Sequence, residues 1–562
     1  MRDPGQARIK LAVAAGLFLI AACSSLVKAR SYDLWWHLEA GERIVSTLSV
    51  PRADDFSFTS AGAPWIDHEW LFQVLLYGFH TLGPLGFTLL KGSCALATAA
   101  IGYWALRRSG SSAGTALAVV ALSVAGMKFR LTERPEAVSL AMATATAAIG
   151  LDLVTRPSSP ARRLVSIALV TILWVNMHAG ALIAPVIMLA CAAGAALDHL
   201  RSSRAVRSGM GPVWLAVPIT AVSLLVNPFG YHIYTVPSGI TEALAPANIT
   251  NPEWTAPSSR EFPLFYFVLL VVAAAALARL ARLRPLAGPR LAILLLAAAM
   301  ALSSVRHIGI FFALLPLMVD LAPAPGNARR GGRLVPVAAL TAVLAACAWM
   351  IVFPQAGAAI GIGVQPGRFP EKAADFIDLH MKEGRLYNDV SFGGYLIWRG
   401  YPVRRVFIDG RNEVHSALLR DLSAAIDDGR RWRDLLDRHG VDGAILMYRP
   451  EIVPVVDADT GRRSAGTFSE LHFPRSDWAL VYWDDTAMVF AGRHGRYSDL
   501  ARTLEYRVAR PEEWALGSFD EEPGPGQEEL AGEIRRKLAE EPGCRLALAA
   551  AGSVSITRER ER

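Results

Sequence analysis

The chain has 562 residues, of which 52% are hydrophobic and only 19% charged, and its formal net charge is +7. Soluble domains carry about 25% charged residues, so this composition predicts an integral membrane protein with a soluble portion. The basic residues sit in short loops between apolar runs, as membrane topology requires, which argues against a nucleic-acid partner. Four of the five cysteines lie inside apolar runs, and the spacing indicates neither a disulfide framework nor a CxxC metal motif.

Long apolar runs predict about eleven membrane-spanning helices, because a span needs about 20 mainly apolar residues. The predicted spans are 9–29, 84–106, 113–129, 135–154, 163–178, 180–199, 212–227, 262–281, 290–305, 307–322 and 334–353. The first run also resembles a signal peptide, since Arg8 and Lys10 precede it and Cys23 follows two alanines. We favour an uncleaved first span, because many further spans follow it.

The placement of arginine and lysine predicts the orientation of these spans. With the N-terminus in the cytoplasm, most basic loop residues fall on the cytoplasmic side, as the positive-inside rule requires. We therefore expect a multi-pass membrane protein with its N-terminus in the cytoplasm. An odd number of spans places the C-terminal part, from about residue 355, outside the cytoplasm.

The parts outside the membrane fall into three predicted segments. The first outside loop, 31–83, contains two amphipathic stretches, 34–48 and 69–82, whose aromatic content suits helices lying in the interface plane. Residues 50–64 carry turn and strand residues. Residues 355–515 are predicted to form an α/β domain, with strands at 385–388, 406–411 and 443–447 and helices at 393–398 and 430–439. Residues 516–562 are predicted to form a linker, a charged helix and a mobile tail.

Unusual polar motifs collect at the predicted outer face, which indicates an active or binding site there. The catalytic candidates are the polar residues of the first outside loop: Asp33, His37, Asp54, Asp55, His68 and Glu69. A carboxylate at the mouth of a membrane cavity can act as a general base toward a hydroxyl. The alternatives are a helix cap for Asp33 and an ordinary solvated turn for Asp54 and Asp55.

Further candidates follow later spans on the same side. Arginine suits bidentate phosphate recognition, which predicts a phosphate site at Arg130, Arg134, Arg306 and His307; the alternative is an interfacial snorkelling cluster. Asn and His this deep are costly in lipid and usually face a cavity. The predicted substrate-binding residues are Trp35, Trp36, Asn176, His178, Glu253 and Trp254, against the alternatives of helix packing and an aromatic belt. Asp409 and Arg411 are interpreted as turn chemistry in the outer domain.

Several of these motifs resemble a bacterial branch of the C-type glycosyltransferase (GT-C) superfamily, which includes protein O-mannosyltransferases and aminoarabinose transferases. The resemblance covers the architecture of roughly residues 8–353 and marks 1–354 as the transmembrane domain. The motifs that carry it are Asp33-Leu34-Trp35-Trp36-His37-Leu38, Trp65-Ile66-Asp67-His68-Glu69-Trp70-Leu71, Trp174-Val175-Asn176-Met177-His178, Asn227-Pro228-Phe229-Gly230, Gly393-Gly394-Tyr395-Leu396-Ile397-Trp398 and Phe407-Ile408-Asp409-Gly410-Arg411.

This resemblance implies transfer of a sugar from a polyprenyl-phosphate donor, usually with inversion, to a lipid, glycan or protein acceptor at the outer face of the membrane. Asp33 would be the counterpart of the first-loop acid, the presumed base. The chain departs from the mannosyltransferase pattern, which has an Asp-Glu pair where this sequence has Asp33 and Leu34. Some members use a divalent cation, Mg²⁺ or Mn²⁺, and the metal ligands here are unknown.

Three other functions remain open at this point. A ligase or polymerase of lipid-linked glycans is chemically close to a glycosyltransferase. A flippase or transporter would predict an inverted repeat and helices broken at the membrane midplane, whereas the polar motifs here gather at one face. A non-catalytic assembly protein would use the outside domain to bind its partners.

Overall fold

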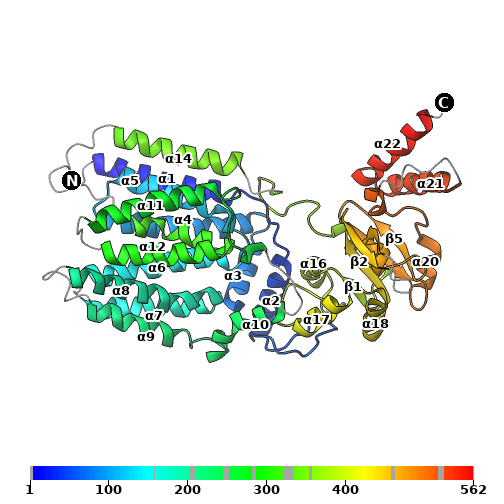
Figure 1. Cartoon of the computed structure of the whole chain (residues 1–562), viewed down its shortest axis with the longest axis horizontal. Helices are drawn as coiled ribbons and strands as arrows, with labels where there is room; N and C mark the ends of the chain where they lie inside the picture. The colour runs from blue at the N-terminus through cyan, green and yellow to red at the C-terminus, as the bar shows by residue number, and fades with distance from the viewer. Residues whose placement is uncertain are drawn as a thin grey trace.

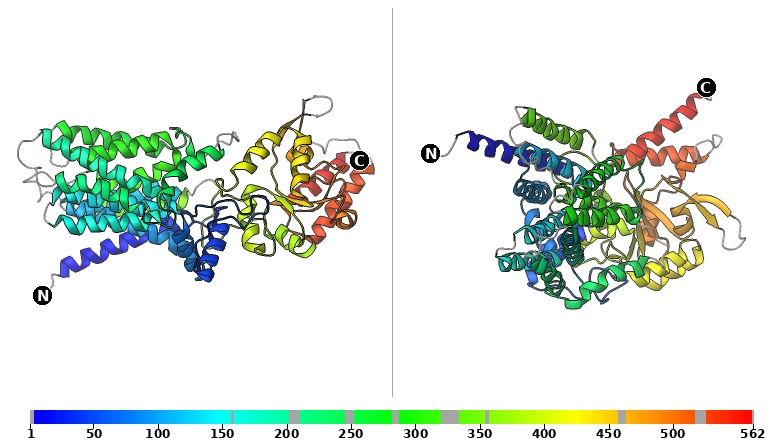
Figure 2. Two further views of the ribbon diagram at one scale, coloured as in Figure 1. Left: turned by 90° about the horizontal axis from the view of Figure 1, so that it is seen from below. Right: turned by 60° about the vertical axis from the view of Figure 1, so that its left-hand side comes forward.

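A helical bundle forms one end of the molecule and an α/β region the other, with α2, α3, α10, α16 and α17 where the two meet (Figure 1). The N-terminus lies at the end of the bundle away from the α/β region (Figure 2). The computed structural model describes residues 4–156, 159–201, 210–244, 252–281, 287–319, 334–353, 357–456, 463–516 and 525–560.

Each predicted span coincides with a helix of the bundle. Five helical segments are long and apolar enough to cross a membrane, at Gln6–Ser25, Leu85–Arg108, Ala113–Arg130, Glu136–Thr155 and Ala179–Leu200, and several shorter apolar helices accompany them. These segments identify an integral membrane protein. The bundle helices are α1 (Pro4–Ser25), α4 (Leu85–Arg108), α5 (Ala113–Met127), α6 (Glu136–Thr155), α7 (Pro160–Val175), α8 (Ala184–Arg201), α9 (Met210–Ser223), α11 (Pro263–Ala281), α12 (Ala287–Ser303), α13 (Ile308–Met318) and α14 (Leu334–Val352).

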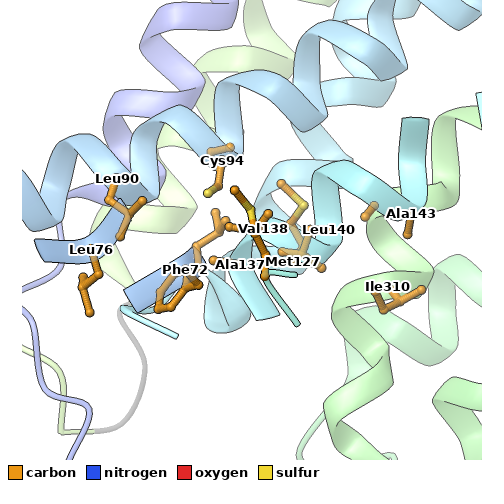
Figure 3. Packing of buried hydrophobic residues seen from close by; sticks show 14 of the residues in the cluster. Phe72, Leu76, Leu90, Cys94, Met127, Ala137, Val138, Leu140, Ala143 and Ile310 are labelled. Atoms are coloured by element: carbon orange, nitrogen blue, oxygen red, sulfur yellow. The ribbon is translucent and has the colours of Figure 1, made fainter. Parts of the chain in front are cut away.

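The two amphipathic stretches of the first loop are helices, as predicted: α2 (Leu34–Thr47) and α3 (Trp70–His80). They cross closely because α2 carries a glycine at the contact; a side chain at Gly41 would overlap the carbonyl oxygen of Gln73. The apolar face of α3 is buried against the bundle, and Figure 3 shows Phe72 and Leu76 near Leu90 of α4. This packing holds the first loop against the end of the bundle.

The C-terminal region is built on a mixed four-stranded sheet in the order β1-β2-β6-β5, which confirms the predicted α/β character. Strand β1 runs parallel to β2, and the other two pairings are antiparallel. The strands are β1 (Leu386–Asn388), β2 (Gly443–Met447), β5 (Trp478–Trp483) and β6 (Ala487–Gly492), with a separate hairpin of β3 (Ile452–Val456) and β4 (Arg463–Thr467). The helices around it are α15 (Glu371–His380), α16 (Val390–Gly400), α17 (Ser416–Ala425), α18 (Gly429–His439), α19 (Phe468–His472) and α20 (Ser498–Leu504).

The strand predicted at 406–411 is wrong. This segment is buried, as expected, but its backbone bonds to the first loop and to a side chain rather than to a neighbouring strand. The amide of Val406 donates to Phe56 O at 3.0 Å, and the amide of Phe407 donates to the side-chain oxygen of Asn388 at 2.9 Å. The segment therefore joins the first loop to the α/β region.

Residues after 516 include two helices that pack on the α/β region, α21 (Pro525–Glu540) and α22 (Arg545–Arg560). The guanidinium of Arg536 lies 3.8 Å from the ring centre of Tyr506, and the ammonium of Lys537 lies 4.4 Å from that of Tyr482. Part of the predicted linker, 517–524, and the last two residues of the predicted tail, 561–562, fall outside the described residues.

Candidate functional site

A cavity of about 640 Å³ opens where the bundle meets the first loop and the α/β region, a volume typical of ligand sites. Its wall comes from segments far apart in the chain. They include the start of α2, the residues before α3, the turn before α6, the turn after α7, and α10 (Val236–Leu244). Two short 3₁₀ helices, η4 (Pro252–Trp254) and η5 (Val305–His307), and residues 410–413 complete it.

Asp33 lies at the wall of this cavity, directly before α2. Its side chain makes no cap hydrogen bond to the helix, so the capping alternative is wrong. Instead its Oδ2 lies 2.7 Å from Nη2 of Arg134, and its Oδ1 accepts from the indole N–H of Trp36 at 3.3 Å. A side chain at Gly410 would come within 2.5 Å of Oδ1. Glycine at that position therefore lets the C-terminal loop lie directly over the carboxylate.

Three arginines form a second side of the cavity: Arg130, Arg134 and Arg306. Arg130 and Arg306 share the carboxylate of Glu136, at 2.7 and 3.2 Å. Arg130 and Arg134 also face Glu253, at 3.0 and 3.5 Å. The nearby carboxylates, Asp33 first among them, raise the pKa of Arg134, so its guanidinium stays charged. These are the donors that an incoming phosphate requires.

The carboxylate of Glu69 faces three imidazoles. The Nε2 atoms of His37, His68 and His178 lie 3.7, 3.5 and 4.0 Å from its oxygens. Burial alone lowers the pKa of His68, but the adjacent Glu69 outweighs burial and raises it to about 9. Burial likewise raises the pKa of Glu69, yet His68 brings it to about 2. The pair is therefore a buried imidazolium and carboxylate at neutral pH.

His178 is oriented by a short chain of hydrogen bonds. The indole N–H of Trp174 donates to Ser139 Oγ at 2.8 Å, and Ser139 lies 2.7 Å from Nδ1 of His178. The amide of Gly180 also donates to Nδ1, at 3.2 Å. Because Nδ1 accepts, the neutral ring carries its proton on Nε2, the atom that faces Glu69. Sequence reasoning missed Ser139, which has no distinguishing neighbour in the chain.

Four candidates from the sequence lie away from the cavity wall. Asp54 caps the turn at Ser57 and pairs with Arg411, and Asp55 pairs with Arg43 and accepts from Tyr401. Trp35 packs edge-on against Phe369 and Tyr395. The side-chain amide nitrogen of Asn176 donates to the backbone carbonyls of Ile172 and Val226, at 2.8 Å each. Its side-chain oxygen accepts from the indole N–H of Trp70. The other candidates, Asp33, Trp36, His37, His68, Glu69, Arg130, Arg134, His178, Glu253, Trp254, Arg306 and His307, all line the cavity.

A fully buried ion cluster locks the C-terminal region to the first loop. One guanidinium nitrogen of Arg411 lies 2.6 Å from both Asp54 and Asp409, and His415 lies 3.1 Å from Asp409. The turn interpretation of Asp409 and Arg411 was therefore incomplete, because Arg411 also lines the cavity. The residues that follow it, Asn412 and Glu413, line the cavity too and were missed by sequence reasoning.

The residues present do not fit the divalent cation that the family resemblance allowed. Within the part of the chain that the structure describes, no group of three or more His, Cys, Asp or Glu is arranged to hold a metal ion. Asp33 is engaged by Arg134, and the neighbours of Glu69 are imidazoles, whereas Mg²⁺ prefers carboxylate and water oxygens. No chemical step is therefore assigned to a metal.

The buried carboxyl of Asp67 makes stability depend on pH. Burial is the largest cause of its raised pKa, about 7 against an ordinary 3.8. The folded state thus holds a proton that the unfolded chain loses, and stability falls as pH rises from about 4 to about 7. We expect Asp67→Asn to remove this loss, which corresponds to roughly 4 kcal/mol above pH 7.

Thermal unfolding of both proteins in detergent between pH 4 and pH 9 measures this effect. The midpoint of Asp67→Asn should exceed that of the parent by a margin that widens up to pH 7 and then stays constant. A margin independent of pH would show that the asparagine acts through packing instead.

Comparison with known proteins shows the fold but no close relative in sequence. No protein-family model and no curated protein matches the chain. The apo oligosaccharyltransferase of Archaeoglobus fulgidus matches with a TM-score of 0.60 and 10% identity, over 95% of this chain and 84% of that one. AglB of the same organism, in complex with an inhibitory peptide and a dolichol-phosphate, matches with a TM-score of 0.56 and 10% identity, over 84% and 79% of the two chains.

A bacterial structure matches as well. ArnT from Cupriavidus metallidurans bound to undecaprenyl phosphate gives a TM-score of 0.50 and 13% identity, over 86% of this chain and 98% of that one. The chain thus has a mostly helical membrane fold with a C-terminal mixed sheet, and this fold resembles that of these oligosaccharyltransferase and ArnT structures.

Proposed function

We propose that this chain is a membrane glycosyltransferase that takes a sugar from a polyprenyl-phosphate donor and transfers it to an acceptor hydroxyl at the outer face of a bacterial cytoplasmic membrane. The observation that carries this proposal is the convergence of the Asp33 carboxylate and three arginines on a single cavity at the end of an apolar bundle. The likeness in fold to membrane glycosyltransferases supports it.

The arginine side of the cavity is the place for the donor phosphate. Arg130, Arg134 and Arg306 present charged N–H donors there, and Glu136 and Glu253 hold them in position until a phosphate competes. The same guanidinium groups stabilise the charge that develops on the leaving phosphate. Leu182, Ile183 and Val236 also line the cavity, and these apolar side chains suit the first isoprene units of the donor.

The acid–base side of the cavity activates the acceptor. In the proposed step, the acceptor oxygen forms a bond to the anomeric carbon while the bond from that carbon to the phosphate oxygen breaks, and the phosphate keeps both electrons. Asp33 takes the acceptor proton as general base. The buried pair of His68 and Glu69 lines the same cavity and orients the acceptor, and Asn412 and Glu413 line it from the C-terminal region.

The proposed orientation of the molecule rests on the placement of its arginines. The bundle end away from the cavity carries Arg107, Arg108, Arg156 and Arg163 near helix ends, as expected of a cytoplasmic face. The cavity and the α/β region would then lie outside the cytoplasm, where lipid-linked sugars are consumed after flipping.

Replacing Arg306 with glutamine tests the donor site. Loss of a charge-assisted bond to phosphate costs roughly 1.5–3 kcal/mol, so KM for a polyprenyl-phosphate sugar should rise roughly ten- to hundredfold. Arg52→Gln is the matched control, because the exposed side chain of this arginine donates to Pro228 O, lies over the ring of Phe229 and is not part of the cavity lining. Initial rates over a donor titration measure the effect. An equal change in both variants would argue against phosphate binding at Arg306.

A further inference from the structure

A second apolar hollow lies beside the cavity, between α5, α11, α13 and α14, with a volume of about 580 Å³. Its lining is mainly apolar. Six large rings line it: Phe129 after α5, Phe262, Phe265 and Phe267 of α11 and its approach, Phe312 of α13, and Trp349 of α14. We call it the α11–α14 groove.

The packing of the bundle explains why this groove is open. Helix α11 packs against α12 and α13, whereas α5 packs against α13 and α14. The gap lies between α11 on one side and α5 and α14 on the other. Gly126 of α5 forms part of the floor, because a side chain there would overlap the ring of Phe312. Two of the lining rings are well exposed, Phe267 by 66% and Trp349 by 43%, and in a bilayer both would contact hydrocarbon.

The mouth of the groove carries positive charge. Lys128 and Arg260 both line it, together with Glu261. The ammonium of Lys128 bonds to the carbonyl of Phe353 at the end of α14 and lies 6.0 Å from the ring centre of Trp349. The carboxylate of Glu261 accepts from Ser258 at 3.0 Å. Basic residues at the end of an apolar groove, near the ends of the helices, attract a lipid with an anionic head group.

The groove and the cavity are neighbours. The side chain of Arg130 passes over Gly309 of α13, where an added Cβ would lie 2.7 Å from its Cγ. Arg130 lines the cavity, and its neighbour Lys128 lines the groove. The cavity already has an apolar side of its own, at Leu182 and Ile183, for one lipid chain. The groove is therefore a second apolar hollow that lies next to the cavity, two residues along the chain from Arg130.

We propose that the α11–α14 groove binds a second, anionic lipid, with its chain among the aromatic rings and its phosphate at Lys128 and Arg260, and that this lipid is the acceptor of the transfer. The site itself stands on the groove and its charges, and only the acceptor role rests on the proposed function. This assignment selects a lipid among the lipid, glycan and protein acceptors that the sequence leaves open.

Photolabelling of the full-length protein in nanodiscs tests the site. The probes are phosphatidic acid with a diazirine on its acyl chain and phosphatidylcholine with the same chain. We expect phosphatidic acid to label α11 and α13 around Phe267 and Phe312 more strongly than phosphatidylcholine does. Arg260→Gln should lower that labelling roughly fivefold, which corresponds to about 1 kcal/mol for one basic residue near a lipid surface. Arg52→Gln should leave the labelling unchanged.

Two outcomes of the labelling would overturn the proposal. Displacement of the label by excess unlabelled polyprenyl phosphate would assign the groove to the donor chain. Equal labelling by the two head groups would mean that only bulk lipid enters it. The labelling measures lipid binding and does not require sugar transfer. A failure of the proposed function would therefore leave the labelling result unchanged.

The acceptor role has its own readout. With a donor carrying a radioactive sugar and nanodiscs made from a bacterial lipid extract, the sugar is expected in a chloroform-soluble product that thin-layer chromatography separates from the remaining donor. Arg260→Gln should lower the yield of that product without changing KM for the donor. Radioactivity recovered only in water or on protein would contradict a lipid acceptor.

Discussion

Replacing Asp33 with asparagine is expected to lower the rate of sugar transfer by roughly 10²- to 10⁴-fold, the usual contribution of a general base. The amide cannot accept the acceptor proton, and it also loses the ion pair with Arg134. The protein should still fold, because the Asp33 side chain is 25% exposed and makes no helix cap. Single-turnover rates with saturating donor separate this loss from weaker binding.

Asp55→Asn is the matched control for that experiment. It removes a carboxylate from the same loop, but Asp55 bonds to Arg43 and Tyr401 outside the cavity wall. We expect its transfer rate to stay near that of the parent. Unchanged transfer in Asp33→Asn, or an equal loss in both variants, would remove Asp33 from the role of base.

Replacing Arg411 with methionine is expected to destabilise the protein by roughly 3–5 kcal/mol, the usual cost of removing one partner from a buried ion pair. Asp54 and Asp409 would be left buried and without their cation, since all three side chains are 0% exposed. The first loop and the C-terminal region should loosen together, because the cluster joins them. Thermal unfolding in detergent and limited proteolysis between the two regions measure the change.

Arg438→Met provides the control for Arg411→Met. Arg438 also pairs with an aspartate, Asp421, at 3.0 Å, but its side chain is 61% exposed, and such pairs contribute about 0–1 kcal/mol. A similar, small loss of stability in both variants would show that the buried cluster does not hold the two regions together.

The bundle is the part of the fold that the sequence predicts best. Each apolar run long enough to span a membrane is a helix, since buried backbone in an apolar setting must satisfy its own hydrogen bonds. Helices α2 and α3 were predicted equally well, because their apolar residues recur at helical spacing. The segment 406–411 has the composition of a strand, yet its partners are Phe56 and Asn388, and no local pattern reveals such distant partners.

Twelve of the candidate residues, Asp33, Glu69 and the arginines among them, line one cavity, whereas Asp54, Asp55, Trp35 and Asn176 do not. The sequence could not show that Asp33 lines the cavity and Asp54 does not. Asp54 pairs with Arg411, which lies 357 positions further along the chain. Glu413 was missed for the same reason: only the fold of the C-terminal region brings its loop over Asp33.

The most direct test of the central claim is release of polyprenyl phosphate by the purified protein in nanodiscs. The protein is incubated with a panel of polyprenyl-phosphate sugars and a bacterial envelope extract that supplies lipid, glycan and protein acceptors, and the products are measured by mass spectrometry. We predict that at least one donor yields free polyprenyl phosphate in an amount that depends on Asp33. Donors that bind the protein but release no polyprenyl phosphate in any combination would contradict a lipid-donor glycosyltransferase.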